Sequence, residues 1–308
     1  MSALTVIRPG MLTTVQDLGR WGHQGLGVPV AGPMDWYSHR LANQIVGNEP
    51  GAAALEMTLI GPELEAEGSV ICAVAGADVD VSVDARAVPL NAPFDVPSGA
   101  RVRVGGRHHG ARATLAVRGG IAVPALFGSR ATHLVSRMGP FGGRPLAAND
   151  RLPVGDAVAG DARTGGKPLP LPYGGSRLRI MAGPQRERFT EDAWSTFTHS
   201  RYTVTPQSNR MGYRLEGARL THVESADILS EATSIGTIQV PASGLPILLM
   251  ADRQTTGGYT SIATVVTADL PIAGQLAPGD WVEFVACSRE QAIAALRERE
   301  AALTAKPH

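Results

Sequence analysis

The amino-acid sequence predicts a mainly β protein with few helices, and three observations carry that prediction. Glycine and proline are frequent, with 36 glycines and 22 prolines among 308 residues, and both residue types end helices and shape tight turns. Several short stretches alternate apolar and polar residues, as half-buried strands do. Helix-starting signals occur at only three places. Many short strands at close spacing favour a sandwich or barrel over a parallel α/β sheet.

Each predicted helix begins at a capping residue. Asp35 can cap a helix over residues 36–45, and Thr190 can cap a second, shorter one. The third and clearest helix is C-terminal, where Ser288 and Gln291 form a capping box. Three apolar residues of this helix are expected to share one buried stripe, namely Ile293, Leu296 and Leu303.

The strongest strand signal is the strict alternation from Asp78 to Asp84. Its valines would face one side of a sheet and its polar residues the other. Further short strands are expected at residues 101–104, 114–117, 177–181, 247–250 and 281–285.

The best candidate for a domain boundary is Gly155–Gly175, which is rich in glycine and proline and has no apolar period. A cut there predicts two domains of similar size, residues 1–165 and 166–308. The triplet Arg-Met-Gly occurs at 137–139 and again at 210–212, on either side of the cut. A duplicated β-barrel would produce such a repeat.

Composition argues against several classes of function. Lys plus Arg equals Asp plus Glu at 28 each, so no general attraction to nucleic acid or to an anionic membrane is expected. Cys72 and Cys287 are the only cysteines, which disfavours a zinc site or a disulfide framework. The N-terminus lacks a signal-peptide pattern, and no apolar run approaches about 18 residues. We therefore expect a cytoplasmic protein without a metal, a nucleic-acid partner or a membrane anchor.

The first polar cluster lies in a glycine-bent segment near the N-terminus. Gln16, Asp17, Arg20 and Asp35 supply an amide, two carboxylates and a guanidinium within about 20 residues. Such a loop can bind a small polar ligand. The alternative is that Asp17 and Arg20 simply pair with each other and cap turns.

The second cluster runs from Ile238 to Val265, on both sides of the apolar strand expected at 247–250. Gln239 and Gln254 can each donate and accept hydrogen bonds, which suits an amide or ureido group. Asp252 can accept a proton or orient a substrate nitrogen. The alternative is a β-turn in which Asp252 caps its own backbone.

A third cluster contains Arg210, Arg214 and Glu216. The two arginines can bind a carboxylate or a carboxyphosphate-like anion through bidentate contacts. Alternating Arg and Glu on a strand can equally form a solvent-facing ladder.

These segments resemble one family. The carboxyltransferase family that includes biotin-dependent members, also called allophanate hydrolase subunit 2, has similar motifs in the same order from about Leu4 to Val285. It includes the C-subunit of 5-oxoprolinase and regulators of the KipA type. The matching stretches are TTVQDLGR at 13–20, GPMD at 32–35, RGGI at 118–121, SNRMGYRLEG at 208–217 and IQVPASGLPILLMADRQTTGGY at 238–259.

The resemblance implies two cyclophilin-like β-barrel domains with a few short helices and a C-terminal helix. It implies a hydrolase component that works in a hetero-oligomer with a cyclophilin-like B-subunit homologue and an A-subunit homologue. That complex opens the lactam 5-oxo-L-proline to L-glutamate with ATP. Two alternatives remain open: a biotin-dependent carboxyltransferase component acting on urea or a related amide, and a KipA-like regulator that binds a B-subunit homologue.

The resemblance also implies site residues. Those expected to be catalytic are Asp252, Gln254, Gln239 and Arg210. Those expected to bind substrate are Gln16, Asp17, Arg20, Asp35, Arg214, Thr256, Gly257, Gly258 and Tyr259. The sequence departs from the family at Thr260, where proline is common. A proline would fix the backbone there, so its loss can loosen the turn.

Overall fold

The computed structural model describes residues 2–157 and 166–305, and these form two compact units. The N-terminal unit contains the residues up to Trp21, Ala31–Leu171 and the residues from Ala301 onward. The C-terminal unit contains Gly22–Val30 and Pro172–Glu300. The domain boundary predicted after residue 165 falls within 158–165, outside the described residues, and it stays a prediction. The units differ from the predicted domains in where residues 22–30, residues 166–171 and the C-terminal residues belong.

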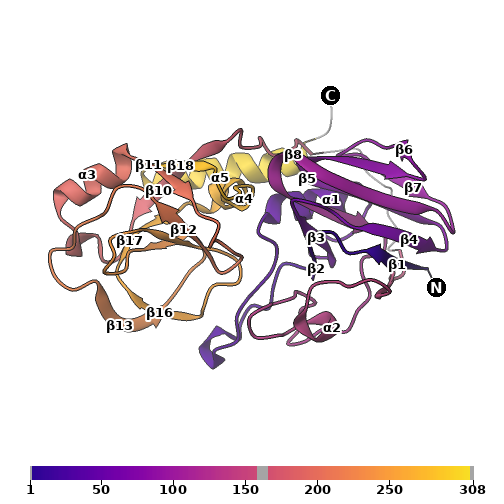
Figure 1. Cartoon of the computed structure of the whole chain (residues 1–308), viewed down its shortest axis with the longest axis horizontal. Coiled ribbons are helices and arrows are strands. Elements are labelled where there is room, and N and C mark those ends of the chain that lie inside the picture. The colour runs from indigo at the N-terminus through magenta and orange to yellow at the C-terminus, as the bar shows by residue number, and fades with distance from the viewer. Residues whose placement is uncertain (1, 158–165, 306–308) are drawn as a thin grey trace. The chain divides into compact units, whose positions relative to one another are not determined.

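The N-terminal unit is built on one antiparallel sheet of nine strands (Figure 1). Its main path runs β2-β3-β8-β4-β1-β9, and β5 pairs with β6, β7 and β8. The sheet curls around a core of aliphatic side chains. The strands are β1 (Ala3–Arg8), β2 (Leu12–Gln16), β3 (Ala54–Thr58), β4 (Glu63–Glu67), β5 (Val70–Val83), β6 (Arg86–Ala87), β7 (Phe94–Val96), β8 (Arg101–Val117) and β9 (Arg151–Pro153).

The alternating segment predicted to be a strand forms the end of β5. Val79, Val81 and Val83 are buried in the core, and Asp80 between them is exposed. This half of β5 pairs with the first half of β8, from Val83 opposite Val102 to Asp78 opposite His109. Burial of one side-chain set explains the period of two in the sequence.

The C-terminal unit contains a closed barrel in the order β10-β17-β14-β15-β12-β11-β18. Strands β10 and β18 pair in parallel, and the other neighbours are antiparallel. A separate ribbon joins β13 and β16 (Figure 1). The strands are β10 (Gly175–Ala182), β11 (Arg201–Val204), β12 (Gly212–Glu216), β13 (Asp227–Ala232), β14 (Thr237–Gln239), β15 (Ile247–Leu249), β16 (Thr256–Tyr259), β17 (Ser261–Val265) and β18 (Trp281–Ala286).

The prediction of a mainly β fold with short helices is confirmed. The barrel of the C-terminal unit is closed, whereas the N-terminal sheet is curled and branches at β5. The helices are α1 (Trp36–Ile45), α2 (Pro140–Gly143), α3 (Glu191–His199), α4 (Leu270–Gly274) and α5 (Arg289–Thr304), with 3₁₀ turns at Gln24–Leu26, Arg186–Arg188 and Thr267–Asp269.

The three predicted caps are confirmed. The Asp35 carboxylate accepts a hydrogen bond from the Ser38 amide at 2.9 Å. The Thr190 hydroxyl accepts one from the Ala193 amide at 3.1 Å. Ser288 and Gln291 exchange side-chain and backbone bonds, which is the reciprocal pattern of a capping box. The predicted stripe on α5 is only partly buried: Leu303 is buried, Leu296 is half-buried, and Ile293 is exposed.

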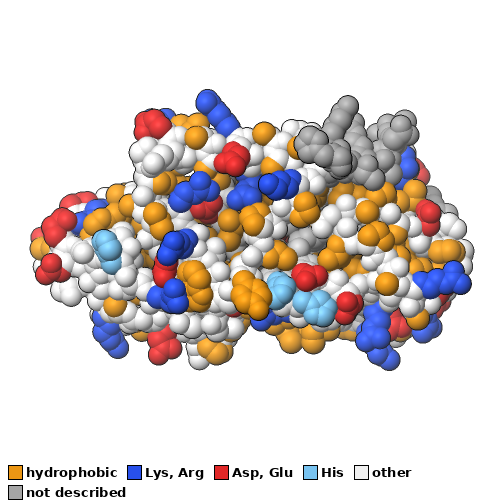
Figure 2. All heavy atoms as spheres, turned by 90° about the horizontal axis from the view of Figure 1, so that it is seen from above, with side chains coloured by type: hydrophobic (Ala, Val, Ile, Leu, Met, Phe, Trp, Pro, Cys, Tyr) orange, Lys and Arg blue, Asp and Glu red, His pale blue; other side chains and the backbone are white. Residues whose placement is uncertain are grey.

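Within the described ranges, no helix is both long and apolar enough to cross a membrane. On the face drawn in Figure 2, basic and acidic side chains are interspersed among apolar ones. This mixture agrees with the equal numbers of basic and acidic residues in the sequence.

His39 is a buried histidine on the inner side of α1. Its ring is fully buried and lies 3.2 Å from the Asn43 side-chain amide. Burial lowers the pKa of His39 from 6.5 to about 4, because the charged ring loses its solvation. The folded protein therefore keeps this ring neutral at pH values where the unfolded chain would protonate it.

Acidification should consequently destabilise the protein through His39. Between pH 6.5 and about 4 the unfolded state binds the extra proton, so this contribution to stability is complete above pH 6.5 and falls as pH falls. From pH 7 to pH 5 the loss should be roughly 2 kcal/mol of unfolding free energy. Urea unfolding of the wild type and His39→Gln at both pH values measures it. The exposed His199→Gln variant is the control for removal of a histidine ring, and an unchanged slope in His39→Gln would contradict the assignment.

Candidate functional site

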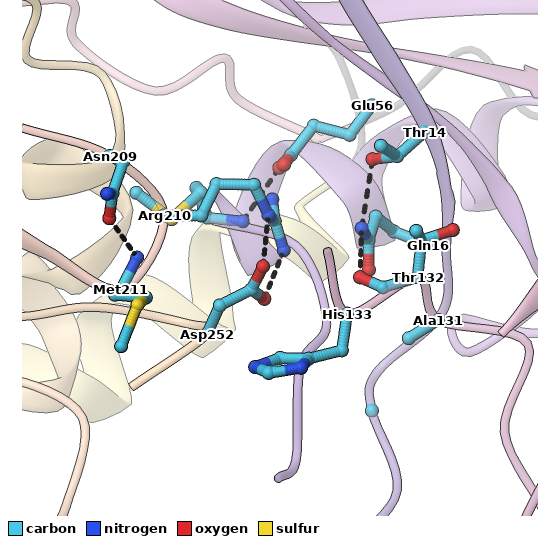
Figure 3. A network of polar contacts seen from close by, with 12 residues as sticks. Thr14, Gln16, Glu56, Ala131, Thr132, His133, Asn209, Arg210, Met211 and Asp252 are labelled. Atoms are coloured by element: carbon cyan, nitrogen blue, oxygen red, sulfur yellow. Dashed lines mark hydrogen bonds and ion pairs between the residues drawn. The ribbon is translucent and has the colours of Figure 1, made fainter. Parts of the chain in front are cut away.

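The first polar cluster of the N-terminal unit lies where β2 ends. Gln16 is fully buried, and its amide nitrogen donates to the Thr14 hydroxyl at 2.9 Å and to the Thr132 carbonyl at 3.1 Å (Figure 3). Its side-chain oxygen has no hydrogen-bond partner among the described residues. The structure thus leaves one buried acceptor of Gln16 open.

Asp17 and Arg20 join the same loop to the segment at residues 126–131. The Asp17 carboxylate accepts hydrogen bonds from the Ser129 hydroxyl and the Arg130 amide, both at 2.5 Å. The Arg20 guanidinium donates to the carbonyl groups of Ala131 and Leu126. Among the described residues Asp17 does not bond Arg20, so the simple pairing considered for these two residues is not what the structure has.

Asp35 and Glu56 are buried carboxylates near the start of α1. Both oxygens of Asp35 are engaged by Ser38, one by its amide and one by its hydroxyl at 2.6 Å. Glu56, on β3, accepts a hydrogen bond from the Met34 amide at 2.7 Å. Sequence reasoning missed Glu56. The signal was present, because a carboxylate inside an apolar strand must find partners when it is buried.

In the C-terminal unit, Arg210 and Asp252 form a bidentate ion pair (Figure 3). Nε and Nη2 of Arg210 lie 3.0 Å and 2.9 Å from the two carboxylate oxygens. Only 4% of Arg210 and 1% of Asp252 are exposed. The Asp252 amide also donates to the Arg210 carbonyl at 2.8 Å. The pair therefore fastens the turn before β12 to the turn after β15.

Gln239, Gln254 and Gly257 lie together, as the sequence predicted for one site. A Cβ atom added to Gly257 would lie 2.7 Å from Nε2 of Gln239 and 3.4 Å from Nε2 of Gln254. A contact of 2.7 Å is shorter than packing allows, so a side chain at position 257 would displace the Gln239 amide. The other predicted residues of this segment, Thr256, Gly258 and Tyr259, share β16 with Gly257.

Arg214 is placed differently from the other predicted residues. Its neighbours on β12, Tyr213 and Leu215, are buried, and Arg214 itself is exposed. Successive side chains of a strand face opposite sides, so Arg214 lies on the outer face of the barrel. Glu216 is exposed as well, which agrees with a solvent-facing arrangement.

Thr260 stands where the family resemblance led us to expect proline, and it makes two contacts that a proline could not make. Its amide donates to the Ala226 carbonyl at 2.9 Å, and its hydroxyl lies 3.0 Å from Nε2 of His222. Proline has neither the amide hydrogen nor a hydroxyl. Two contacts to the segment at residues 222–226 thus stabilise the turn, a role that a proline ring would otherwise have.

Sequence reasoning also passed over Arg253, which is buried between two predicted site residues. Its position in the chain is the only signal that the sequence offers. Among the described residues, no group of three or more His, Cys, Asp or Glu side chains is placed to hold a metal ion.

Comparison with known proteins identifies the family. The family described as "Carboxyltransferase domain, subdomain A and B" matches residues 26–286. This chain belongs to that family. The resemblance inferred from the sequence motifs is thereby confirmed.

Relatives match this family member over nearly its whole length. The C-subunit of 5-oxoprolinase from Escherichia coli (strain K12) is 38% identical over 297 residues, which are 96% of this chain and 95% of the relative. That of Haemophilus influenzae (strain ATCC 51907 / DSM 11121 / KW20 / Rd) is 32% identical over 287 residues, covering 93% and 92%. The crystal structure of the Kluyveromyces lactis urea carboxylase matches with a TM-score of 0.93 and 33% identity, over 98% of this chain and 29% of that chain.

Breaking the Arg210–Asp252 pair should strongly destabilise the C-terminal unit. Arg210→Met would leave a buried carboxylate without its counter-ion, and such losses cost about 3–5 kcal/mol. Chemical denaturation of purified protein measures the change in unfolding free energy. As a control, Arg151→Met removes the exposed pair with Glu67, whose nitrogen–oxygen distance is 2.7 Å, and should leave stability nearly unchanged. Equal effects of the two variants would show that the buried pair has no special structural role.

Proposed function

We propose that this chain is the C-subunit of an ATP-dependent 5-oxoprolinase complex, which converts 5-oxo-L-proline to L-glutamate. The observation that carries the proposal is the 38% identity with the corresponding E. coli 5-oxoprolinase component, along 96% of this chain and 95% of that protein. A match over the full length of both proteins favours the same role more than a match to one part of a much longer enzyme. We further propose that the protein is cytoplasmic and acts only together with a B-subunit homologue and an A-subunit homologue.

The reaction requires an activated lactam. A lactam is a resonance-stabilised amide, so water attacks it slowly at neutral pH, and phosphorylation of its oxygen by ATP would make the carbon electrophilic. The sequence contains no P-loop. We therefore propose that a partner protein, or a surface shared with one, binds ATP.

In this proposal the amides of Gln239 and Gln254 orient the lactam. Each side chain offers both a donor and an acceptor, which matches the N–H and C=O of the ring. Gly257 allows the substrate and both amides to approach the backbone closely. Arg210 and Asp252 engage each other, so their contribution is to position the turn that carries Gln254. Gln16, Asp17, Arg20 and Asp35 shape the loops of the N-terminal unit that we expect to contact substrate.

A second candidate is a biotin-dependent carboxyltransferase component that acts on urea or a related amide. It is supported by the family's description and by the TM-score of 0.93 to the K. lactis urea carboxylase. The buried amide of Gln239 beside Gln254 fits a ureido ring, which has the same donor and acceptor pattern as a lactam. These two residues would hold biotin, which supplies a carrier for an activated carboxyl group.

Glutamate release from 5-oxo-L-proline with ATP tests the first proposal. This chain is co-purified with its B-subunit and A-subunit homologues, and the assay is repeated with each component left out. We expect glutamate to form only when all three are present, because in this proposal each chain supplies a different part of the machinery.

An intact complex that releases no glutamate would contradict the 5-oxoprolinase proposal. The same complex would then be assayed for biotin-dependent carboxylation of urea. Glutamate release that persists without this chain would likewise exclude an essential role for it.

Gly257→Ala should lower the activity of the complex without unfolding the protein. The added Cβ would meet the Gln239 amide at 2.7 Å and the Thr233 methyl at 3.1 Å, so the amide must move. Displacing a substrate-positioning group by about 1 Å can cost on the order of 100-fold in rate. Steady-state glutamate release and the melting temperature are measured together. Gly106→Ala, where the added Cβ meets nothing within 4 Å, is the control, and equal activity of the two variants would contradict the site.

A further inference from the structure

Arg253 is a buried arginine without a carboxylate partner. Only 8% of the residue is exposed, and its Nε donates a long hydrogen bond of 3.4 Å to the Thr233 carbonyl. Within the part of the chain that the structure describes, no ion pair involves Arg253, and its two terminal nitrogens have no hydrogen-bond acceptor. Those nitrogens keep some contact with solvent, because they are not among the fully enclosed atoms that lack a partner. A ligand can therefore reach them.

The charge of Arg253 is costly in this environment. Burial lowers the pKa of the guanidinium from its ordinary value, which is the effect of lost solvation. The adjacent carboxylate, Asp252, is engaged by Arg210 in a bidentate pair and so does not balance it. A buried charge is stable when an opposite charge and hydrogen bonds compensate it. An anionic ligand would supply both.

Thr233 connects Arg253 with the predicted amide residues. Its carbonyl accepts the Arg253 bond, and its methyl group lies 3.1 Å from the Cβ position of Gly257. The Gln239 amide lies 2.7 Å from that same position. Gln239 is only 3% exposed, so its side-chain amide lies in the interior of the unit. Thr233 thus lies between the Arg253 guanidinium on one side and the Gln239 and Gln254 amides at Gly257 on the other.

We propose that the guanidinium of Arg253 binds a small oxyanion beside the amides of Gln239 and Gln254, and that this oxyanion is the carboxylate of 5-oxo-L-proline. The identity of the occupant rests on the proposed function, whereas the oxyanion site rests on the geometry alone. A guanidinium binds a carboxylate through two parallel hydrogen bonds. The amides then remain for the lactam N–H and C=O. A phosphoryl group presents the same oxyanion chemistry, so the test distinguishes the two.

Calorimetric titration of the full chain tests the proposal with three probes: 5-oxo-L-proline, the neutral lactam 2-pyrrolidinone, and inorganic phosphate. We expect wild-type protein to bind 5-oxo-L-proline more tightly than the other two. Arg253→Gln should weaken that binding by about 10- to 100-fold, which is typical for loss of a charged hydrogen bond. Arg253→Lys keeps the positive charge but loses the pair of parallel N–H donors, so its affinity for 5-oxo-L-proline should lie between those of the wild type and Arg253→Gln. Arg289→Gln removes an exposed arginine of α5 and should bind as the wild type does.

Stability separates a binding role from a structural one. If Arg253 serves the fold, Arg253→Gln should lower the melting temperature. If it serves a ligand, removal of an uncompensated buried charge should leave the melting temperature of the ligand-free protein unchanged or raise it. Added 5-oxo-L-proline should then stabilise the wild type and Arg289→Gln more than Arg253→Gln.

Several outcomes would overturn the inference. Equal binding of 5-oxo-L-proline to wild type and Arg253→Gln would do so, as would absence of binding by the full chain or tighter binding of 2-pyrrolidinone. Arg253-dependent binding of phosphate instead would support the oxyanion site and overturn the carboxylate as its occupant. A complex whose glutamate release is insensitive to Arg253→Gln overturns this inference alone. An inactive wild-type complex in which this chain still binds 5-oxo-L-proline through Arg253 overturns the proposed function alone.

Discussion

The buried ion pair between Arg210 and Asp252 governs the predicted site of the C-terminal barrel. Asp252 directly precedes Arg253 and Gln254, so the two bonds that fix its carboxylate also fix the start of the segment that leads into β16. A bidentate guanidinium–carboxylate pair is specific in direction as well as in distance. The cost of burying both charges is offset only in that geometry. The turn fixed in this way leads into the segment in which Gln254 and Gly257 lie beside Gln239.

The polar cluster of the N-terminal unit is held by hydrogen bonds to backbone groups and hydroxyls. Asp17 and Arg20 bind backbone groups and a hydroxyl of the loop at residues 126–131, which is distant in sequence, whereas Asp35 caps its own helix through Ser38. Without these side chains the buried backbone groups would lack partners. Irregular backbone can be buried only when side chains meet this need. Residues that stabilise loops in this way can still shape a ligand pocket, because binding sites are often built from loops that are held in position.

The segment that leads into β16 matches a family motif, and Thr260 directly after it differs from the residue expected there. The motif ADRQTTGGY is followed by Thr260, where the family resemblance led us to expect proline. The bonds of Thr260 to Ala226 and His222 supply a constraint of a different kind. Arg253, inside the same motif, differs from Arg210 in its partners. Both arginines are buried in one unit, but Arg210 is paired with a carboxylate while Arg253 is not, and only the second is free to select an anion among the described groups.

The mainly β fold, the three helix caps and the valine alternation of β5 could be predicted from the sequence, because each depends on residues within a few positions of one another. The grouping of Gln239, Gln254 and Gly257 was also expected, since family motifs place them in one site. Pairing between groups far apart was not predictable. Asp252 meets Arg210 across 42 positions, and Asp17 meets Ser129 across 112, so no spacing rule reveals which polar groups bind each other. The exposure of each side chain was not predictable either: Glu56 and Arg253 are buried, whereas Arg214 is exposed on β12. The sequence by itself determines which types of polar group the chain contains. Which of them remain available to a ligand depends on long-range packing, because burial and pairing exist only in the folded chain.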